Sequence, residues 1–253
     1  MNAPKISVCI PTYEMGGKGA GFLERALSNL LSQDFDDFEV VVSDQSEDHA
    51  VRNLCESWKQ DLCIAYFDNS AGKRQASANS NFAIERARGE IVKILFQDDF
   101  LCEKTALSKM GDAFTDKRID WLVCGSCISR DGSSLEKPMV PRLSERMHFG
   151  ENTVSSPSVL AMRGSCVQKF DESLIWLMDV EMYRRLWRKF GEPAILKETL
   201  IANCVHSGQV SAGITREIML NELNQVWRLH GADTSIGGKL EYLKRRLKLA
   251  WTM

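Results

Sequence analysis

Apolar and polar positions follow two different periods in the first hundred residues. Short runs that are apolar at nearly every position alternate with stretches in which apolar residues recur at helical spacing. The expected strands are 6–10, 38–43, 64–67 and 91–96, and the expected helices are 22–31, 50–59 and 79–87. Strands that are apolar throughout and separated by helices predict a mostly parallel sheet with helices on both faces. The carboxyl ends of such strands share one edge, where open α/β sheets bind ligands.

The pattern is looser in the second half of the chain. Residues 129–157 are rich in Ser, Pro and Gly and have little periodicity. The expected helices there are 104–114, 179–190, 216–230 and 239–251, and the expected strands are 121–126 and 194–202. We therefore expect one α/β domain over 1–215, with a nucleotide-binding half (1–100) and an irregular acceptor-side, catalytic half (101–215). A helical segment follows at 216–253, with a flexible connection at 231–238.

Composition narrows the function classes. The chain has 32 Lys and Arg against 34 Asp and Glu, so its net charge of -2 offers no global basic field for nucleic acid. No apolar run approaches the ~20 residues of a membrane-spanning helix, and no signal-peptide core is evident. Eight cysteines in such a chain indicate reduced thiols and a cytoplasmic location. Cys124 and Cys127 have no second pair that would complete a zinc site, and we predict no metal or redox role for them.

Polar clusters follow three of the expected strands, at 11–14, 43–48 and 97–99. Each cluster alone is typical of a turn or a helix cap. Their shared edge, however, favours a binding site. Asp98 and Asp99 are adjacent carboxylates that repel each other, which favours a nearby cation such as Mg²⁺ or Mn²⁺ with phosphate ligands. The P-loop and GxGxxG patterns are missing, which argues against a P-loop ATPase or a dehydrogenase.

Two features stay open on the residues alone. His206 is either a structural histidine or a ligand in a polar segment. Asp179 and Glu181 begin a helix, where acids stabilise the amino terminus, but a general base facing the sheet edge is equally consistent with the pattern.

Taken in order, these segments resemble the nucleotide-sugar glycosyltransferases of family 2, from Ile6 to about Ser211. The resemblance implies the GT-A fold, a Rossmann-like nucleotide-binding sheet. It implies Asp179 as the catalytic base, Asp99 and His206 as ligands of Mn²⁺ or Mg²⁺, and Asp44 as the residue that reads the base. The nucleotide-binding residues it implies are Pro11, Thr12, Tyr13, Glu14, Asp44, Asn81 and Asp98. The chain departs from the family pattern at Ser43, Gln45 and Phe96.

The activity implied by the resemblance is transfer of a sugar from a nucleoside-diphosphate donor to an acceptor hydroxyl, metal-dependent and inverting. We expect a UDP-sugar, with dTDP- and GDP-sugars as alternatives, and a saccharide or lipid-linked saccharide acceptor. Trp176 either stacks on that acceptor or is buried in the core. The setting suggested by short bacterial members is surface-polysaccharide biosynthesis, such as O-antigen or capsule.

Two rival functions remain. A nucleotidyltransferase also joins a parallel sheet to an acidic metal site, but its basic Gly-rich loop is not evident, because 16–21 contains only Lys18. A non-catalytic nucleotide-sugar-binding protein is disfavoured by the full set of acidic residues and His206.

The closing segment 239–251 carries five basic residues against Glu241, together with apolar residues at helical spacing. It is either a helix packed on the core with a solvated basic face, or an interfacial helix at the inner face of the plasma membrane.

Overall fold

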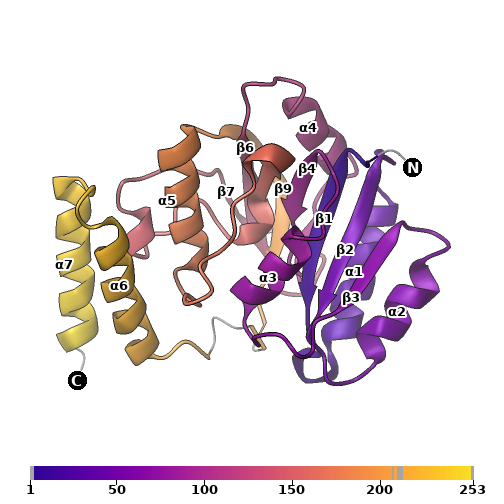
Figure 1. Cartoon of the computed structure of the whole chain (residues 1–253), viewed down its shortest axis with the longest axis horizontal. Coiled ribbons are helices and arrows are strands. Elements are labelled where there is room, and N and C mark those ends of the chain that lie inside the picture. The colour runs from indigo at the N-terminus through magenta and orange to yellow at the C-terminus, as the bar shows by residue number, and fades with distance from the viewer. Residues whose placement is uncertain (1–2, 207, 210–212, 252–253) are drawn as a thin grey trace.

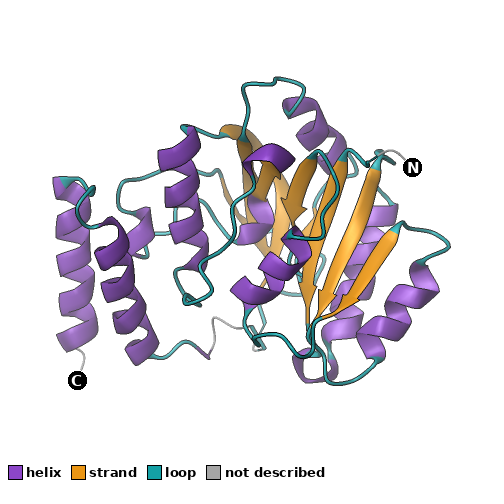
Figure 2. Cartoon of the chain, viewed as in Figure 1, coloured by secondary structure: helices purple, strands orange, loops and turns teal. Residues whose placement is uncertain are grey.

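A mixed sheet runs through the molecule, with helices on both faces (Figures 1 and 2). The computed structural model describes residues 3–206, 208–209 and 213–251. Within them the strand order is β3-β2-β1-β4-β8-β6-β9-β5, and β7 pairs with β6. The strands are β1 (Ile6–Thr12), β2 (Phe38–Asp44), β3 (Ile64–Asp68), β4 (Ile91–Ile94), β5 (Phe100–Leu101), β6 (Trp121–Ser129), β7 (Glu136–Met139), β8 (Leu160–Arg163) and β9 (Ala194–Cys204). The helices are α1 (Gly19–Leu31), α2 (Ala50–Trp58), α3 (Ala76–Ile84), α4 (Ala106–Ala113), α5 (Met178–Phe190), α6 (Arg216–His230) and α7 (Ile236–Trp251).

The first four strands form the parallel half of the sheet. β1 pairs in parallel with β2 on one side and with β4 on the other, and β3 continues the parallel order beyond β2. Every residue of β1 and β4 is buried, and most of them are apolar; the polar exceptions are Ser7, Thr12 and Lys93. Helix α3 packs against β1 and β2 on one face, and α1 and α2 pack against each other behind the sheet (Figure 1). This half confirms the predicted α/β class.

The expected end of the first strand at Pro11 is wrong. β1 continues through Pro11 to Thr12, and Pro11 pairs with Ser43 of β2. The carbonyl oxygen of Cys9 accepts a hydrogen bond from Leu95, so Pro11, two residues later, faces the same neighbour. The pairing with β4 has already ended at Ile94. The missing N–H of Pro11 therefore costs the ladder no hydrogen bond.

The second half of the sheet is mixed in direction. β8 lies antiparallel between β4 and β6, whereas β6 and β9 run parallel with irregular register. The segment expected to be irregular, 129–157, contains the short strand β7 and a helical turn over Met147–Phe149. Parallel pairing thus belongs mainly to β1–β4, and antiparallel pairing enters with β8.

Element boundaries differ from the expectation where tertiary bonds intervene. α3 begins at Ala76 rather than Asn79, because the polar Ser77 is buried and donates to the Leu174 carbonyl. α7 begins at Ile236, so the connection expected at 231–238 is shorter than predicted.

Helices α6 and α7 lie together at the end of the molecule opposite α2 (Figure 1). The rings of Trp227 and Tyr242 stack with centroids 4.2 Å apart, and the Tyr242 hydroxyl donates to Asn224 Oδ1 at 3.0 Å. Phe149 packs against Tyr242 from the sheet side, with ring centroids 5.6 Å apart. None of the helices in the described ranges is both long and apolar enough to span a bilayer.

Candidate active site

A cleft of about 640 Å³ opens at the carboxyl ends of β1, β2 and β4. One wall comes from the first half of the chain and includes Pro11, Tyr13, Glu14, Gln45, Asn79 and residues 96–99. The other wall comes from the second half and includes Gly150, Asn152, Ser156, Asn203 and residues 175–180. The fold therefore brings together seven of the predicted site residues: Pro11, Tyr13, Glu14, Asp98, Asp99, Trp176 and Asp179.

The loop after β1 is held by Gln97. The backbone N–H of Tyr13 donates to Gln97 Oε1 at 2.7 Å, and Gln97 Nε2 donates to the carbonyls of Tyr13 and Gly19. A Cβ on Gly19 would lie 2.0 Å from the Tyr13 carbonyl, so α1 can begin this close to the loop only with glycine there. Glu14 Oε2 is buried and has no hydrogen-bond partner within the described residues, although Arg74 lies 3.8 Å away. Glu14 therefore forms a loose ion pair with Arg74 beside the cleft.

Asp98 pairs with His206 at the edge of the cleft. His206 Nε2 lies 3.1 Å from Asp98 Oδ2, and the Phe22 ring stacks on the imidazole with centroids 4.7 Å apart. Arg25 donates to the Asp98 carbonyl at 2.6 Å and orients this turn. Ser211, where the family resemblance ends, lies outside the described residues.

Asp99, by contrast, points into the protein. Its Oδ2 accepts hydrogen bonds from Ser158 at 2.6 Å and Ser156 at 3.3 Å, and its Oδ1 accepts from the backbone N–H of Cys204 at 3.0 Å. Burial, and then the neighbouring Asp98 charge, raise the pKa of Asp99 to about 8. We therefore revise the metal assignment: Asp98, rather than Asp99, faces His206.

The Asp98–His206 pair fits a divalent cation. The 3.1 Å between the two atoms is a hydrogen bond in this structure, and the carboxylate oxygen and imidazole nitrogen that form it are both atom types that bind divalent metals. No group of three His, Cys, Asp or Glu side chains that could hold a metal is found among the described residues. A cation here would need further oxygen ligands from elsewhere, and phosphates commonly supply them.

Asp179 stands at the start of α5 on the opposite wall. Its Oδ2 accepts from Asn152 Nδ2 and its Oδ1 from the Val180 N–H, each at 2.7 Å. Burial raises the pKa of Asp179 to about 7. A carboxylate whose pKa lies near the working pH is suited to general base catalysis.

Glu181 has a different environment from Asp179. It lies on another side of α5 and accepts from Arg185 Nη2 at 2.7 Å and from His230 Nε2 at 3.1 Å. Burial alone would raise the pKa of Glu181. The hydrogen bonds from His230 and Arg185 outweigh burial and lower this pKa to about 2. Within α5 the ion-pair partner of Glu181 is Arg185, four residues later.

Trp176 lines the cleft beside Gly150. A Cβ on Gly150 would lie 2.8 Å from the Trp176 ring, and the φ of Gly150 is +88°, so this position requires glycine twice over. The half-exposed indole is consistent with the predicted acceptor contact, which stays a prediction.

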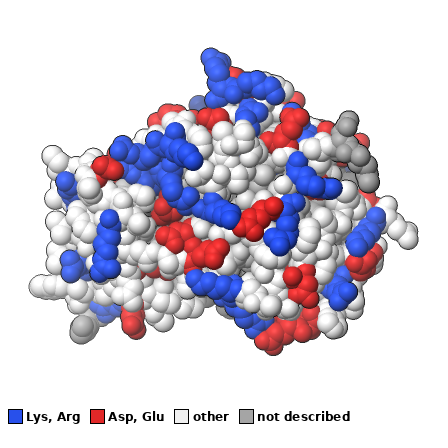
Figure 3. Space-filling view, in the orientation of Figure 1, with Lys and Arg blue, Asp and Glu red and all other residues white. Residues whose placement is uncertain are grey.

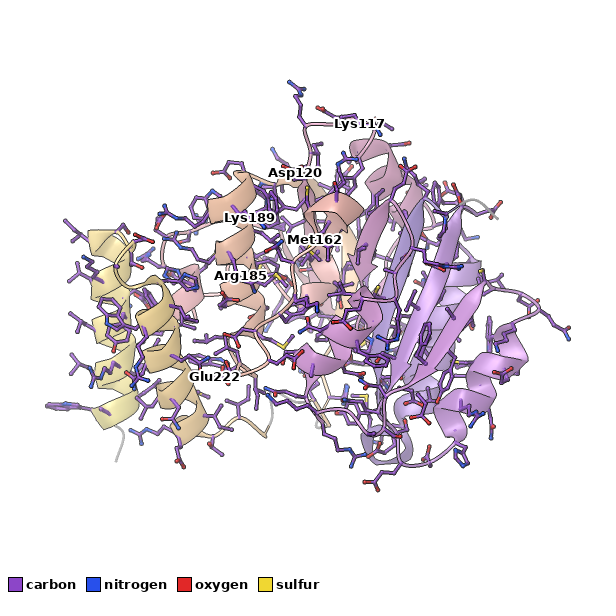
Figure 4. The ribbon with its side chains drawn as sticks, viewed as in Figure 1. Lys117, Asp120, Met162, Arg185, Lys189 and Glu222 are labelled. Atoms are coloured by element: carbon purple, nitrogen blue, oxygen red, sulfur yellow. The ribbon has the colours of Figure 1, made fainter. Side chains whose placement is uncertain are left out.

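Glu222 is a site residue that the sequence reasoning missed. From α6, its carboxylate accepts the backbone N–H groups of Ile175 at 2.7 Å and of Trp176 and Leu177 at 2.9 Å (Figure 4). Burial raises the pKa of Glu222. A signal existed in the sequence: Glu222 lies four residues before Val226, on the core-facing side of the expected helix.

Three predicted nucleotide-binding residues lie beneath the cleft surface. Asp44 accepts from Thr12, Ser46 and Tyr66, so both of its oxygens are already occupied, and Gln45 lines the cleft instead. Thr12 is buried beside Asp44. Asn81 bonds the Phe170 backbone and holds the loop before Trp176, whereas Asn79, two residues earlier in α3, lines the cleft. Base recognition by Asp44 stays a prediction.

The comparison with protein families decides the class. The description "Glycosyl transferase family 2" matches residues 7–173, more than half of the chain. The chain belongs to glycosyl transferase family 2. In this family 2 chain, residues of the polar clusters that follow β1, β2 and β4 line one cleft.

Curated relatives of this family 2 chain match over part of their length. It is 30% identical over 138 residues to GalNAc(5)-diNAcBac-PP-undecaprenol beta-1,3-glucosyltransferase of Campylobacter jejuni, covering 53% of this chain and 41% of that protein. It is 39% identical over 85 residues to validoxylamine A glucosyltransferase of Streptomyces hygroscopicus, covering 32% of this chain and 19% of that protein. The chain thus spans less than half the length of these relatives.

Solved family 2-like structures confirm the GT-A fold over nearly the whole chain. S. aureus TarS 1-349, solved with UDP-GlcNAc, has a TM-score of 0.72 at 18% identity and covers 98% of this chain and 73% of its own. The mannosyltransferase PcManGT from Pyrobaculum calidifontis, solved with GDP-Man and Mn2+, has a TM-score of 0.66 at 20% identity. The match covers 100% of this chain and 71% of the PcManGT chain.

Proposed function

We propose that the chain transfers a sugar from a nucleoside-diphosphate donor to an acceptor hydroxyl with inversion of configuration. The observation that carries this proposal is that two acidic residues with different surroundings lie on opposite walls of one cleft. Asp98 lies beside His206 on the wall from the first half, and Asp179, with a pKa of about 7, lines the wall from the second half. A single displacement needs a base for the acceptor and stabilisation of the leaving diphosphate, and each wall supplies one of these.

Asp179 acts as the base in this proposal. Its carboxylate takes the proton of the acceptor hydroxyl as that oxygen attacks the anomeric carbon, and the bond to the donor diphosphate breaks. Asn152 holds one carboxylate oxygen, and the Val180 N–H holds the other. Trp176 would present its ring to the acceptor sugar beside the base.

Asp98 and His206 would hold the divalent cation. Bound Mn²⁺ or Mg²⁺ would supply Lewis-acid stabilisation of the charge on the leaving diphosphate. Glu14 and Gln45 would face the nucleoside, and the Glu14 carboxylate, which lies 3.8 Å from Arg74, would accept an N–H or O–H of the donor.

The donor and acceptor classes are also part of the proposal. Two structures of similar fold were solved with UDP-GlcNAc and with GDP-Man and Mn2+, which supports a sugar nucleotide and a cation. The C. jejuni relative is named for an undecaprenol diphosphate-linked saccharide, which supports a lipid-linked acceptor and a role in a bacterial surface polysaccharide. We favour a UDP-sugar, with dTDP and GDP as alternatives, and a cytoplasmic site of action.

The division expected at residue 215 stays a proposal about sequence segments. Residues 1–215 would bind both substrates, and 216–253 would support the second wall through Glu222.

Turnover tests this function directly. Release of UDP, GDP or dTDP from matching sugar nucleotides should require both Mn²⁺ and an undecaprenol diphosphate-linked saccharide, and the product should carry the inverted anomeric configuration by NMR. Thermal shift with each nucleotide, with and without Mn²⁺, identifies the donor base, because ligand binding raises stability. Release of pyrophosphate from a nucleoside triphosphate and a sugar phosphate would indicate a nucleotidyltransferase instead.

A further inference from the structure

Helix α7 presents an apolar stripe to solvent. The side chains of Ile236, Leu240, Leu243, Leu247 and Trp251 are exposed by between 50% and 84%. At 100° per residue, these positions fall within an arc of about 80° along the whole helix. Single exposed apolar residues are common, but a continuous stripe of them marks an interaction surface.

The opposite side of α7 is already packed on the protein. Tyr242 stacks on Trp227 of α6, and a Cβ on Gly238 would lie 2.8 Å from the Glu145 carbonyl. Arg216 at the start of α6 donates to the Leu249 carbonyl. Glu241 is buried on this side and accepts from Arg245 at 3.0 Å. The apolar stripe is therefore not the packing face, and these contacts hold it outward.

Exposed cations border the stripe on both sides. On the helical wheel Lys239 and Arg246 lie on one side of it, and Lys244 and Lys248 lie on the other, all within about 100° of its centre. In Figure 3 the α7 end of the molecule is mostly white with several blue patches. The one acidic residue of α7, Glu241, faces the protein interior.

This charge pattern discriminates between occupants. If two copies of the chain paired through their stripes, the bordering cations of both copies would be brought together, although Lys244 lies 3.6 Å from Glu241 of its own helix. An anionic lipid surface instead accepts apolar side chains at the acyl boundary and cations at the phosphates. Trp251, at the end of the stripe, is the residue type that settles at a membrane interface.

We propose that α7 lies in the plane of an anionic membrane surface, with its leucine stripe in the acyl boundary and its cations at the lipid phosphates. The role of this membrane contact rests on the proposed function, because the contact would hold the cleft near a lipid-linked acceptor. The contact itself depends only on α7. The neighbouring helix α6 links the two, since Glu222 of α6 holds the loop that carries Trp176.

Vesicle co-sedimentation of the full chain at physiological salt tests the proposal. The wild type should bind vesicles of phosphatidylcholine with phosphatidylglycerol and bind pure phosphatidylcholine far more weakly. Replacing Lys239, Lys244 and Lys248 by Gln should weaken binding on the order of 100-fold, because each cation contributes about 1 kcal/mol, or about fivefold, near such a surface. The triple variant Leu240→Ser, Leu243→Ser, Leu247→Ser should lose at least tenfold.

The matched control carries three serines at apolar residues of similar exposure outside α7: Leu31→Ser, Leu135→Ser and Val140→Ser, exposed by 49%, 52% and 51%. It should bind vesicles like the wild type. An equal loss in this control, or no binding by the wild type, overturns the proposal. A dimer in sedimentation velocity without lipid that dissociates in the leucine variant would also overturn it, since the stripe would then be a protein interface.

A water-soluble acceptor keeps the two proposals apart. A chain that binds anionic vesicles but transfers no sugar removes the proposed function and leaves the membrane contact. A chain that transfers sugar to the soluble acceptor but does not bind vesicles removes the membrane contact and leaves the proposed function. The leucine variant should keep wild-type turnover on that acceptor.

Discussion

The two walls of the cleft are built in different ways. On the wall from the first half, Tyr13 and Asp98 follow the ends of β1 and β4, and the side chain of Gln97 ties the two ends together through hydrogen bonds to the Tyr13 backbone. On the wall from the second half, Asp179 and Trp176 lie on a loop and a helix start that side chains from distant segments hold. Asn152 bonds Asp179, and Glu222 bonds the Trp176 backbone.

This contrast has a mechanical consequence. Strand register fixes β1, β2 and β4 through many backbone bonds, so a single side-chain change on the first wall, other than at Gln97, should leave its shape intact. The second wall depends on a few buried side-chain bonds, each of which can be removed separately. The two walls should therefore respond differently to substitution: one in donor affinity, the other in turnover.

Asp179→Asn should cause the largest loss. Removing the base should lower turnover by about 10²–10⁴, because the amide cannot take the acceptor proton. Glu181→Gln, two residues away in the same helix, is the control and should change turnover less than about twofold. Steady-state turnover of both variants at saturating Mn²⁺ measures this. An inactive Glu181→Gln beside an active Asp179→Asn would transfer the base to Glu181.

Asp98→Asn should weaken donor binding when Mn²⁺ is present. Loss of a metal ligand should cost on the order of 100-fold in Mn²⁺-dependent affinity, at least as much as the loss of a residue that supports a ligand. Asp99→Asn should instead lower the melting temperature, because it disturbs the bonds to Ser158 and Cys204. Calorimetric titration with UDP distinguishes the variants. A weakened Asp99→Asn beside an unchanged Asp98→Asn would restore the original assignment.

The pH dependence of turnover should carry the signature of Asp179. Its pKa of about 7 means that the base is protonated, and inactive, below neutrality. The rate kcat/KM should fall about tenfold per pH unit below ~7 and level off above it. A profile measured with donor saturated that stays flat down to pH ~5 would show that a group with an ordinary carboxylate pKa does the work.

Glu222→Gln should loosen the second wall alone. The amide offers one acceptor oxygen to the three N–H groups at residues 175–177, and hydrogen bonds to charged groups contribute about 1.5–3 kcal/mol. We expect about a tenfold fall in kcat/KM for the acceptor with unchanged donor affinity. Glu217→Gln, on the exposed side of the same helix, is the matched control. Equal effects in both variants would contradict a positioning role.

The smallest expected effect concerns stability in acid. The pKa of Glu181 is about 2 in the folded chain and about 4.3 in an unfolded one. A depressed carboxylate pKa stabilises the fold above the unfolded value, and this stabilisation disappears as the pH falls from about 4.3 toward 2. Melting temperatures across this window should therefore fall more steeply for the wild type than for Glu181→Gln. Parallel curves would mean that the His230 and Arg185 contacts contribute little.

The same contrast explains what the sequence could and could not predict. The apolar runs of β1, β2 and β4 and the polar residues after them carry their own signal, so the fold and the first wall could be predicted. The register of Asp179 and Glu181 also followed from helical spacing and family resemblance. The core-facing position of Glu222 on the expected helix could have marked it as buried, but its role could not be identified, because its partners are backbone groups of a segment far away in the sequence.

Neighbouring residues were harder to separate. Asp99, and not Asp98, accepts hydrogen bonds from Ser158 and Cys204. Both of those partners come from the second half of the chain, so the sequence pattern around the two aspartates does not distinguish them. Asn79 and Asn81 are likewise distinguished by a distant contact. The side chain of Asn81 hydrogen-bonds the Phe170 backbone, whereas Asn79 lines the cleft. For α7 the leucines and the cations could be read from the sequence. That the apolar stripe faces outward could not, because it follows from the packing of Tyr242 and Gly238 against the protein.

The central claim is that donor binding and proton removal lie on separate walls. Calorimetric affinities for UDP, with and without Mn²⁺, across Asp98→Asn, Asp179→Asn and Glu222→Gln test it most directly. We expect Asp98→Asn alone to lose the Mn²⁺-dependent part of the affinity, while the other two bind like the wild type. An equal loss of UDP affinity in Asp179→Asn or Glu222→Gln would contradict the separation.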